Sequence, residues 1–270
     1  MQANTHETSP LLTRRDGAVL ILSNNNPAAR NALTVGYYDA LTIAMRQAAC
    51  DPTVGAVVLT GEGGHFCSGG DLRRLAKSRE LSQAQRRVRL EGLHDLIRAV
   101  RDCPKPVLAA VEGAAAGAGL SLALACDMLV SAKNAVFSVA YVKVGLTPDG
   151  GATAFLAEFV SRQVLTELCL TGERISGERM HALGAVNRLT EPGDALAQAL
   201  LMAGQLAAGP DQAMASIKSL CRNAYSQTLE EQLEQEAQCM VLAQESDESQ
   251  EGIGAFLEKR KADFVRLRWS

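Results

Sequence analysis

The sequence predicts an α/β fold that ends in a helical C-terminal region. Short β-branched runs that end in turn signals alternate with amphipathic helical segments, and the strand signals stop near Pro192. The 270 residues are 47% hydrophobic and 21% charged, which is typical of a globular protein with a large core. We therefore expect an α/β core over residues 1–192 and a helical region over residues 193–270.

Five strands are expected where an apolar run is too short for a helix and ends at a turn residue. They cover residues 17–23, 55–60, 106–111, 128–131 and 136–139. Between the first two, a helix is expected to begin after Thr34, because threonine is a favourable N-cap. Apolar residues then recur about every four positions, at Tyr37, Leu41, Met45 and Ala48.

Three helices are expected in the C-terminal region, over residues 194–208, 210–225 and 228–245. Pro210 suits the first turn of the second helix, and Thr228 with Glu231 forms a capping box for the third. A final amphipathic stretch carries the apolar residues Ile253, Phe256 and Leu257. We expect this region to pack on a partner surface, another subunit included.

Charge and composition exclude several classes of function. Lys and Arg number 27 against 30 Asp and Glu, and aromatic residues make up 4%, so the chain lacks the basic field and stacking surface of nucleic-acid-binding proteins. No apolar run approaches the roughly 20 residues of a membrane span. Residues 1–16 include Glu7 and Asp16 and no apolar stretch, so neither a signal peptide nor a transit peptide is expected.

Cysteines and histidines show no metal-binding or redox spacing. The closest cysteines, Cys50 and Cys67, are 17 residues apart, far from the Cys-x-x-Cys pattern. The four histidines share no helical spacing; they are His6, His65, His94 and His181. We expect reduced thiols, a cytoplasmic location and no bound metal.

The segment 73–89 is strongly basic and has few large apolar residues. Its cations are Arg73, Arg74, Lys77, Arg79, Arg86, Arg87 and Arg89. One interpretation is a solvated helix face. The other is a flexible lid that meets a phosphate-bearing ligand.

Two of the expected strands run into glycine-rich turns that open a helix, at residues 61–72 and 112–120. Neither turn has the spacing of a P-loop or of a dinucleotide-binding turn. Small residues let main-chain amides approach a ligand, and a helix N-terminus adds its positive dipole end, so both turns suit an oxyanion. The alternative is that these glycines only make tight turns.

Five motifs follow one another along residues 12–265. They are Arg30-Asn31-Ala32-Leu33, Phe66-Cys-Ser-Gly-Gly-Asp71-Leu72, Gly113-Ala-Ala-Ala-Gly-Ala-Gly119, Gly145-Leu-Thr-Pro148-Asp149-Gly-Gly and Ala255-Phe256-Leu-Glu-Lys259-Arg260. Together they resemble the enoyl-CoA hydratase/isomerase (crotonase) superfamily, and the tail is most similar to phenylacetate-pathway enoyl-CoA isomerases. The resemblance implies a spiral of β-β-α units and C-terminal helices that assemble a homotrimer or hexamer. It also implies an acyl-CoA substrate, with coenzyme A as part of that substrate and no separate cofactor.

The resemblance also implies roles for individual residues. In the family, two main-chain N–H groups stabilise a thioester enolate, and the matching positions here are Gly70 and Ala118. Ala118 stands where the family usually has glycine, but an amide donor survives that change. The residues implied to contact the acyl-CoA, with the last two often from a neighbouring subunit, are Arg30, Ala32, Ser68, Asp71, Leu72, Gly117, Ser121, Tyr141, Phe256 and Lys259.

Hydratases of the family use two glutamates, and both positions differ here. They hold Ser121 and Tyr141, whose hydroxyl groups are poor bases near neutral pH. Asp149 is the carboxylate that remains in motif context, and relatives with aspartate there include double-bond isomerases, a ring-epoxide isomerase and dehalogenases. The alternative role of Asp149 is the N-cap of a helix that begins near Gly151.

We therefore expect an enzyme that holds a thioester enolate at Gly70 and Ala118 and moves a proton with Asp149, as in double-bond or ring isomerisation. The alternatives are an enoyl-CoA hydratase, a hydrolase or dehalogenase on the same scaffold, and a non-catalytic acyl-CoA-binding protein.

Overall fold

The structure is a computed structural model that describes residues 9–269. Its main sheet has six strands, β1 (Leu11–Asp16), β2 (Val19–Asn24), β3 (Ala56–Gly61), β4 (Val107–Val111), β6 (Met128–Ala132) and β9 (Arg188–Thr190). They are ordered β1-β2-β3-β4-β6-β9. The β1–β2 pair is antiparallel and the other neighbours are parallel, as expected where helices connect successive strands.

A second sheet has three short strands, β5 (Ala114–Ala116), β7 (Val136–Ser138) and β8 (Arg174–Ser176). The chain passes from β4 to β5 and from β6 to β7, so each turn gives one strand to each sheet before a helix returns it. This arrangement confirms the spiral of β-β-α units that the family resemblance implies.

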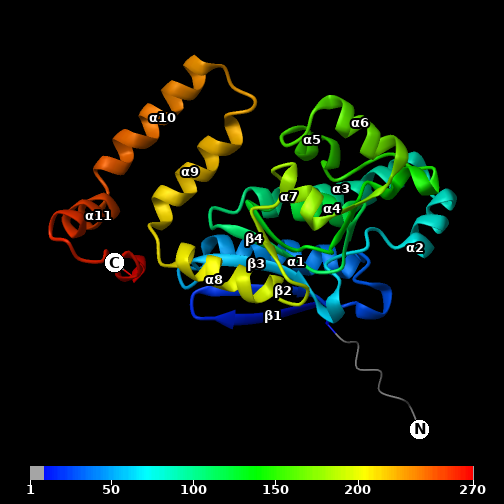
Figure 1. The fold of residues 1–270 in the computed structure, drawn as a ribbon, viewed down its shortest axis with the longest axis horizontal. Coiled ribbons are helices and arrows are strands. Elements are labelled where there is room, and N and C mark those ends of the chain that lie inside the picture. The colour runs from blue at the N-terminus through cyan, green and yellow to red at the C-terminus, as the bar shows by residue number, and fades with distance from the viewer. Residues whose placement is uncertain (1–8, 270) are drawn as a thin grey trace, which may run out of the picture.

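The two faces of the main sheet are covered by different helices. α1 (Val35–Cys50) and α3 (Gln83–Arg101) pack on one face, and α8 (Ala195–Ala207) packs on the other (Figure 1). Strand residues alternate between the two cores, since Val57 and Leu59 face the first while Ala56 and Val58 face the second. Every fourth residue of α8 is a buried alanine, which lets this helix lie close to the strands.

The remaining helices of this part are short. They are α2 (Leu72–Lys77), α4 (Ala118–Leu124), α5 (Ala152–Ala157), α6 (Arg162–Thr171) and α7 (Gly177–Ala182). Among residues 9–269, no helix has both the length and the apolar character needed to cross a bilayer.

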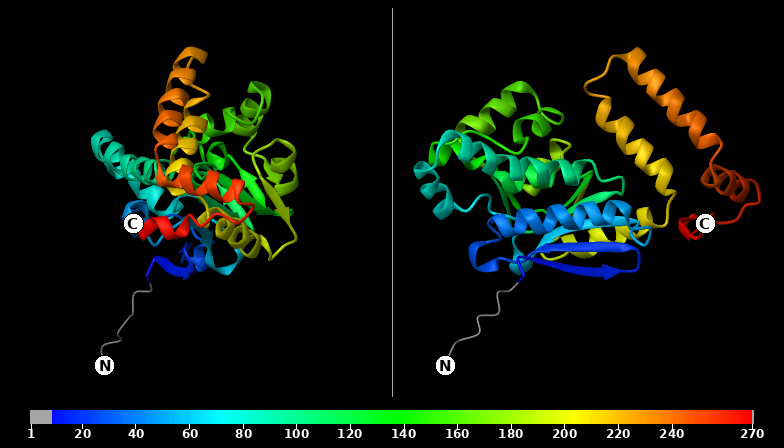
Figure 2. Two further views of the ribbon diagram at one scale, coloured as in Figure 1. Left: turned by 90° about the vertical axis from the view of Figure 1, so that its left-hand side faces the viewer. Right: turned by 180° about the vertical axis from the view of Figure 1, so that it is seen from behind.

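The C-terminal arm consists of α9 (Asp211–Asn223), α10 (Leu229–Gln244) and α11 (Asp247–Leu257). Figure 2 shows the arm standing away from the sheets. The predicted capping box is present, because Thr228 accepts from the amide of Glu231 and the Glu231 side chain accepts from that of Thr228. The predicted helical region from residue 193 also includes α8, which the structure places on the sheet.

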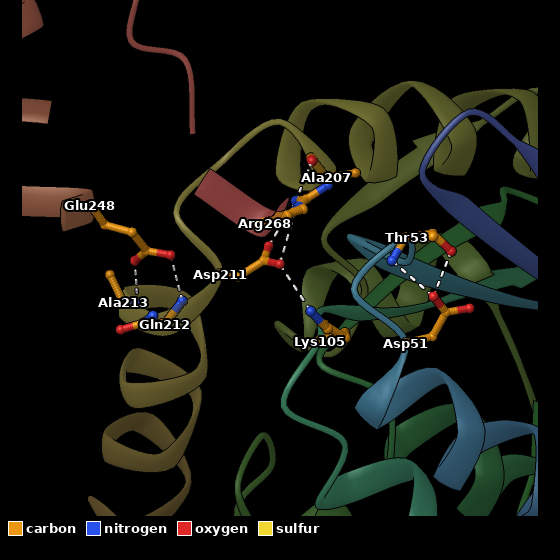
Figure 3. A network of polar contacts seen from close by, with 9 residues as sticks. All are labelled: Asp51, Thr53, Lys105, Ala207, Asp211, Gln212, Ala213, Glu248 and Arg268. Carbon is orange, nitrogen blue, oxygen red and sulfur yellow. Dashed lines mark hydrogen bonds and ion pairs between the residues drawn. The ribbon is translucent and has the colours of Figure 1, made fainter. Parts of the chain in front are cut away.

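A polar junction ties the arm to the sheets (Figure 3). The Asp211 carboxylate, at the start of α9, lies 2.9 Å from Nζ of Lys105 and 2.7 Å from Nη2 of Arg268. Glu248 of α11 accepts from the amides of Gln212 and Ala213, which satisfies the N-terminus of α9. The arm is therefore anchored to the sheets by paired charges, while the Glu248 cap joins α11 to α9 within the arm.

The sequence prediction was wrong on four strands, because β1, β5, β8 and β9 were not expected. β1 is an edge strand with mostly polar residues, so its hydrophobic pattern does not predict a strand. Its hydrogen bonds to β2 give it strand geometry. β5 is three alanines, which carry no β-branched signal. β8 and β9 have three residues each, too few for an alternating pattern to be read.

Candidate active site

The two glycine-rich turns lie side by side. The amide of Cys67 in the first turn donates to the carbonyl oxygen of Ala114 at 2.8 Å, and the amide of Ala116 donates back to that of Cys67 at 3.0 Å. This short parallel pairing joins a loop that follows β3 to a strand that follows β4. Segments about 50 residues apart in sequence thereby share one site.

Two glycines allow the turns to touch. Gly69 has φ 98° and a Cβ there would lie 2.8 Å from the carbonyl oxygen of Ala116. Gly117 has φ 52° and a Cβ there would lie 3.8 Å from Cα of Gly69. Positive φ and this close approach both favour glycine. The next residues in each turn, Gly70 and Ala118, therefore flank the contact.

The main-chain amides of Gly70 and Ala118 donate no hydrogen bond to any group within residues 9–269. The amides just before them are paired, that of Gly69 with Sγ of Cys67 and that of Gly117 with the carbonyl oxygen of Ser138. Ala118 is the first residue of α4, where a helix leaves the amide without an intrahelical partner, and Gly70 is half-buried, so both donors are free for a ligand. Such donors are what an oxyanion hole requires.

Asp149 lies half-buried in the loop between η4 (Ala140–Val144) and α5. Its Oδ1 accepts a hydrogen bond of 2.7 Å from the hydroxyl of Tyr141. The N-cap interpretation is wrong, because α5 is preceded by Gly151 in the left-handed conformation and has no side-chain cap. The carboxylate of Asp149 therefore does not cap the N-terminus of α5.

Ser121 and Tyr141, at the two positions that hold glutamates in hydratases of the family, both contact the Asp149 loop. The hydroxyl of buried Ser121 donates to the carbonyl oxygen of Asp149 at 2.9 Å. A Cβ on Gly117 would lie 3.8 Å from Cζ of Tyr141, so the hydroxyl end of the Tyr141 ring lies near both the Asp149 carboxylate and the second turn. The structure brings Ser121, Tyr141, Asp149 and Gly117 together, and their roles toward a substrate stay predictions.

Electrostatics favour a basic carboxylate at Asp149. Burial raises the pKa of Asp149, and the hydrogen bond from Tyr141 and the charge of His94 offset only part of that rise. Burial, with the charge of Asp149 next, also raises the pKa of Tyr141, so its hydroxyl stays protonated as a donor. A carboxyl group whose pKa moves toward neutral pH is better suited to proton transfer.

His94 is a residue whose position beside Asp149 the sequence analysis missed. It lies on α3, next to buried Leu93 and one turn before buried Ile97, so it borders the face that packs inward. That helical spacing was the available signal. Its effect on Asp149 could not be read from the sequence, since the two residues are 55 positions apart.

The Arg30–Leu33 motif runs alongside the first turn. The amide of Ser68 donates to the carbonyl oxygen of Arg30 at 3.0 Å, and the amide of Leu33 donates to that of Gly69 at 2.8 Å. Arg30 is exposed and Ala32 is buried at this contact. These predicted substrate contacts therefore border the turn that carries Gly70.

Asp71 and Leu72 begin helix α2. The Asp71 carboxylate accepts from the amides of Arg73 and Arg74, so its observed role is the N-cap of α2. Leu72 is exposed at the start of the helix. The other cations of the basic segment are exposed along α2 and the start of α3, whereas Arg74 is half-buried and lies over the Tyr38 ring at 6.0 Å. Contact of this segment with a phosphate-bearing ligand stays a prediction.

Phe256 and Lys259 do not reach the site of their own chain. They lie at the end of α11, on the side of the molecule opposite α2 (Figure 1). Phe256 is 83% exposed. A role for either residue at the acyl-CoA would therefore require a second copy.

Two further acidic residues have structural partners, Glu112 at the second turn and Asp127 at the opposite end of β4. Glu112 accepts from the amides of Gly193 and Ala195 at the start of α8. Asp127 forms an ion pair of 2.6 Å with Lys218. Within residues 9–269, no three His, Cys, Asp or Glu side chains gather as a metal site, and His6 lies outside the described residues.

Comparison with known proteins gives one family. The family model described as enoyl-CoA hydratase/isomerase matches residues 14–266. The chain is 33% identical to a 2,3-dehydroadipyl-CoA hydratase of Escherichia coli (strain K12), over 95% of this chain and 98% of that protein. It is 32% identical to a 1,2-epoxyphenylacetyl-CoA isomerase of the same organism, over 94% of this chain and 98% of the relative.

Solved structures agree with this relationship. The crystal structure of an enoyl-CoA hydratase from Polaromonas sp. JS666 is similar with a TM-score of 0.92 and 48% identity, covering 94% of this chain and 98% of that one. The family match, the relatives and the paired glycine turns thus point the same way. The chain belongs to the enoyl-CoA hydratase/isomerase family of the crotonase superfamily.

Proposed function

We propose that this acyl-CoA enzyme is an isomerase that shifts a double bond, or opens a strained ring, next to a CoA thioester. The observation that carries the proposal is a single carboxylate, Asp149, in a site where Ser121 and Tyr141 occupy the positions of the two hydratase glutamates. Hydration needs a base for water and an acid for carbon, whereas a double-bond shift moves one proton and needs one such group.

In the proposed reaction of a β,γ-unsaturated thioester, Asp149 takes a proton from the α carbon. The electrons of that C–H bond form a dienolate, whose oxygen accepts hydrogen bonds from the amides of Gly70 and Ala118. The dienolate collapses to the α,β-unsaturated thioester as Asp149 returns the proton to the γ carbon. The proton that leaves the α carbon returns at the γ carbon, so the step balances without water, an oxidant or a reductant.

The second candidate is an enoyl-CoA hydratase, and the names of relatives favour it. The E. coli relative at 33% identity and the solved Polaromonas structure are both named hydratases, while the relative at 32% identity is named an isomerase. The two reactions differ in the fate of water. Under the isomerase proposal, crotonyl-CoA should be hydrated poorly, because Asp149 has no second acid beside it.

A panel of thioesters tests the proposal. β,γ-unsaturated aliphatic acyl-CoA and aromatic ring-epoxide acyl-CoA are incubated with the enzyme in deuterated water, with crotonyl-CoA as the hydration substrate. Isomerised product with solvent deuterium at carbon supports the proposal, and faster hydration than isomerisation overturns it. Calorimetric binding without turnover on any substrate would instead support a non-catalytic acyl-CoA-binding protein.

We also propose that the arm assembles a homotrimer or hexamer, which would give Phe256 and Lys259 access to a neighbouring site. Large apolar side chains are exposed along the arm, on α10 at Leu229, Leu242 and Met240, and on α11 at Ile253, Phe256 and Leu257. The double variant Phe256→Asp with Leu257→Asp leaves the junction at Asp211 intact. Light scattering should show smaller particles for this variant, and an unchanged mass would contradict a role of this face.

A further inference from the structure

We propose that Tyr141 and Ser121 are positioning residues that clamp the Asp149 loop from two sides and leave one carboxylate oxygen, Oδ2, for the substrate. The inference deepens the isomerase proposed above and rests on it. Three side chains meet here, Ser121 from α4, Tyr141 from η4 and Asp149 from the loop before α5.

Tyr141 holds both ends of the loop. Its carbonyl oxygen accepts from the amide of Leu146 at 3.0 Å, where the loop starts. Its hydroxyl donates to Oδ1 of Asp149 at 2.7 Å, where the loop returns. The ring itself is buried, so few other rotamers are open to it. A short loop is thus tied to a side chain that is fixed by packing.

Ser121 fixes the backbone of the same loop. It is fully buried on α4, and its hydroxyl donates to the carbonyl oxygen of Asp149 at 2.9 Å. Gly150 has φ 60°, and a Cβ there would lie 3.0 Å from Cβ of Ser121. The main chain at residues 149–150 therefore packs directly against Ser121, and this contact fixes the distance of the Asp149 carboxylate from α4.

The two contacts leave the carboxylate with one occupied and one open oxygen. Oδ1 is engaged by Tyr141, and Oδ2 accepts no hydrogen bond from the part of the chain that the structure describes. A proton-transferring carboxylate must present its oxygen in a fixed place, because small misplacements cost large factors in rate. The clamp supplies this fixed place without a second acid.

The ionisable groups that face Asp149 come from three elements. They are Tyr141 of η4, His94 of α3 and Tyr38 of α1, whose ring has Arg74 of α2 over it. The hydrogen bond from Tyr141 lowers the pKa of Asp149 more than the charge of His94 does. Removal of the Tyr141 hydroxyl should therefore raise the pKa of Asp149, a change that loss of packing alone does not produce.

Tyr141→Phe tests the clamp, with Tyr37→Phe as the matched control. Tyr37 is also buried, and its hydroxyl has no hydrogen-bond partner within residues 9–269. In Tyr141→Phe, kcat for isomerisation should fall about 10- to 100-fold, since a hydrogen bond to a charged group is lost. The acid limb of the kcat/KM profile should move up by about one pH unit, with KM nearly unchanged. Tyr37→Phe should move neither.

Ser121→Ala gives a second arm that separates the two contacts. It should lower kcat severalfold and shift the acid limb less than Tyr141→Phe does, because the Ser121 hydroxyl donates to the main chain of Asp149 at 2.9 Å and lies 3.5 Å from the Tyr141 hydroxyl; Ser121→Thr should restore part of the rate. Circular dichroism and thermal unfolding verify that each variant is folded. The clamp is overturned if the acid limb of Tyr141→Phe coincides with that of the unmodified enzyme. If Tyr141→Phe does not fold, an unchanged rate in Ser121→Ala overturns the clamp instead.

A titration that does not depend on turnover distinguishes failure of the clamp from failure of the isomerase proposal. The carboxyl carbons of Asp residues are labelled with ¹³C, and the Asp149 signal is assigned by its loss in Asp149→Asn. A higher pKa in Tyr141→Phe supports the clamp whatever the reaction is. Full isomerase activity in Asp149→Asn would overturn the reaction, and an unmoved Asp149 titration would overturn the clamp alone.

Discussion

The sheltered carboxylates of Asp149 in the site and Asp211 in the junction have opposite kinds of partner. Asp211 meets two cations, Lys105 and Arg268, and Arg268 is itself only 5% exposed (Figure 3). Asp149 meets the neutral hydroxyl of Tyr141, and no cation lies within ion-pair distance of it in the described chain. Both carboxylates are held by short contacts, yet only one is neutralised.

Under the proposed function, this difference distinguishes a structural charge at Asp211 from a proton-transferring one at Asp149. The charge of a carboxylate paired with cations is compensated by its partners, and breaking the pair leaves sheltered charges without a counterion. A carboxylate that is buried without a cation keeps a raised pKa and can exchange a proton with a substrate. Substitutions at the two aspartates should therefore have opposite effects on activity and stability.

The largest effect is expected for Asp149→Asn. Loss of a positioned acid–base group typically lowers the rate by about 10²–10⁴-fold, whereas acyl-CoA binding should stay close to normal because the amide keeps the size of the side chain. Turnover and solvent deuterium exchange measure the first effect, and calorimetry measures the second. Normal turnover in this variant would remove Asp149 from the reaction.

The same variant should gain stability at neutral pH. The pKa of Asp149 is raised in the folded protein, so its favourable contribution is present below the unfolded pKa of about 3.9 and is lost as pH rises through the folded value. At pH 7 the ionised carboxylate therefore costs stability, and Asp149→Asn should raise Tm there. Thermal melts at pH 7 and near pH 3 should show that the gain disappears in acid.

Ala118→Pro should have the next largest effect on rate. Proline removes the main-chain donor at the first residue of α4, a position where helices tolerate proline, and loss of one such donor costs about 10²–10³ in rate. The matched check is the circular dichroism spectrum and Tm of the variant. A folded Ala118→Pro enzyme with undiminished kcat would show that this amide does not hold the oxyanion.

Asp211→Asn should reverse the pattern of Asp149→Asn. It leaves Lys105 and Arg268 sheltered without their carboxylate, so the free energy of unfolding should fall by about 3–5 kcal/mol. Urea unfolding measures this loss, and kcat at a temperature where the variant is folded should be unchanged. A fall in kcat without a fall in stability would mean that the junction communicates with the site.

The smallest effect is expected for His94→Gln. In acid, the charge of His94 lowers the pKa of Asp149, so its loss should raise the acid limb of the kcat/KM profile by about a few tenths of a pH unit. The maximal rate should hardly change. A loss of kcat comparable to that in Asp149→Asn would instead make His94 a carrier of the proton.

Local sequence determined much of this protein. The Thr34 and Thr228 caps, the helical spacing of Leu41 and Met45, and the small residues of both turns fixed helices and turns because each acts through neighbours a few positions away. The ordered motifs further predicted the family, the spiral of β-β-α units and Asp149 as the remaining carboxylate. The pattern failed for β5, whose three alanines acquire strand geometry only from pairing with Phe137 and its neighbours.

Tertiary structure alone decided what surrounds the aspartates. Whether Asp149 capped a helix or met a phenol depended on the path of the loop after η4, and its approach to Ser121 and His94 depended on the packing of α4 and α3. The same holds for Asp211, whose cations come from positions 105 and 268. Burial and long-range contacts set the pKa of a carboxylate, and neither is encoded in a few neighbouring residues. The sequence therefore predicted Asp149 as the acid–base residue, whereas only the fold determined its pKa.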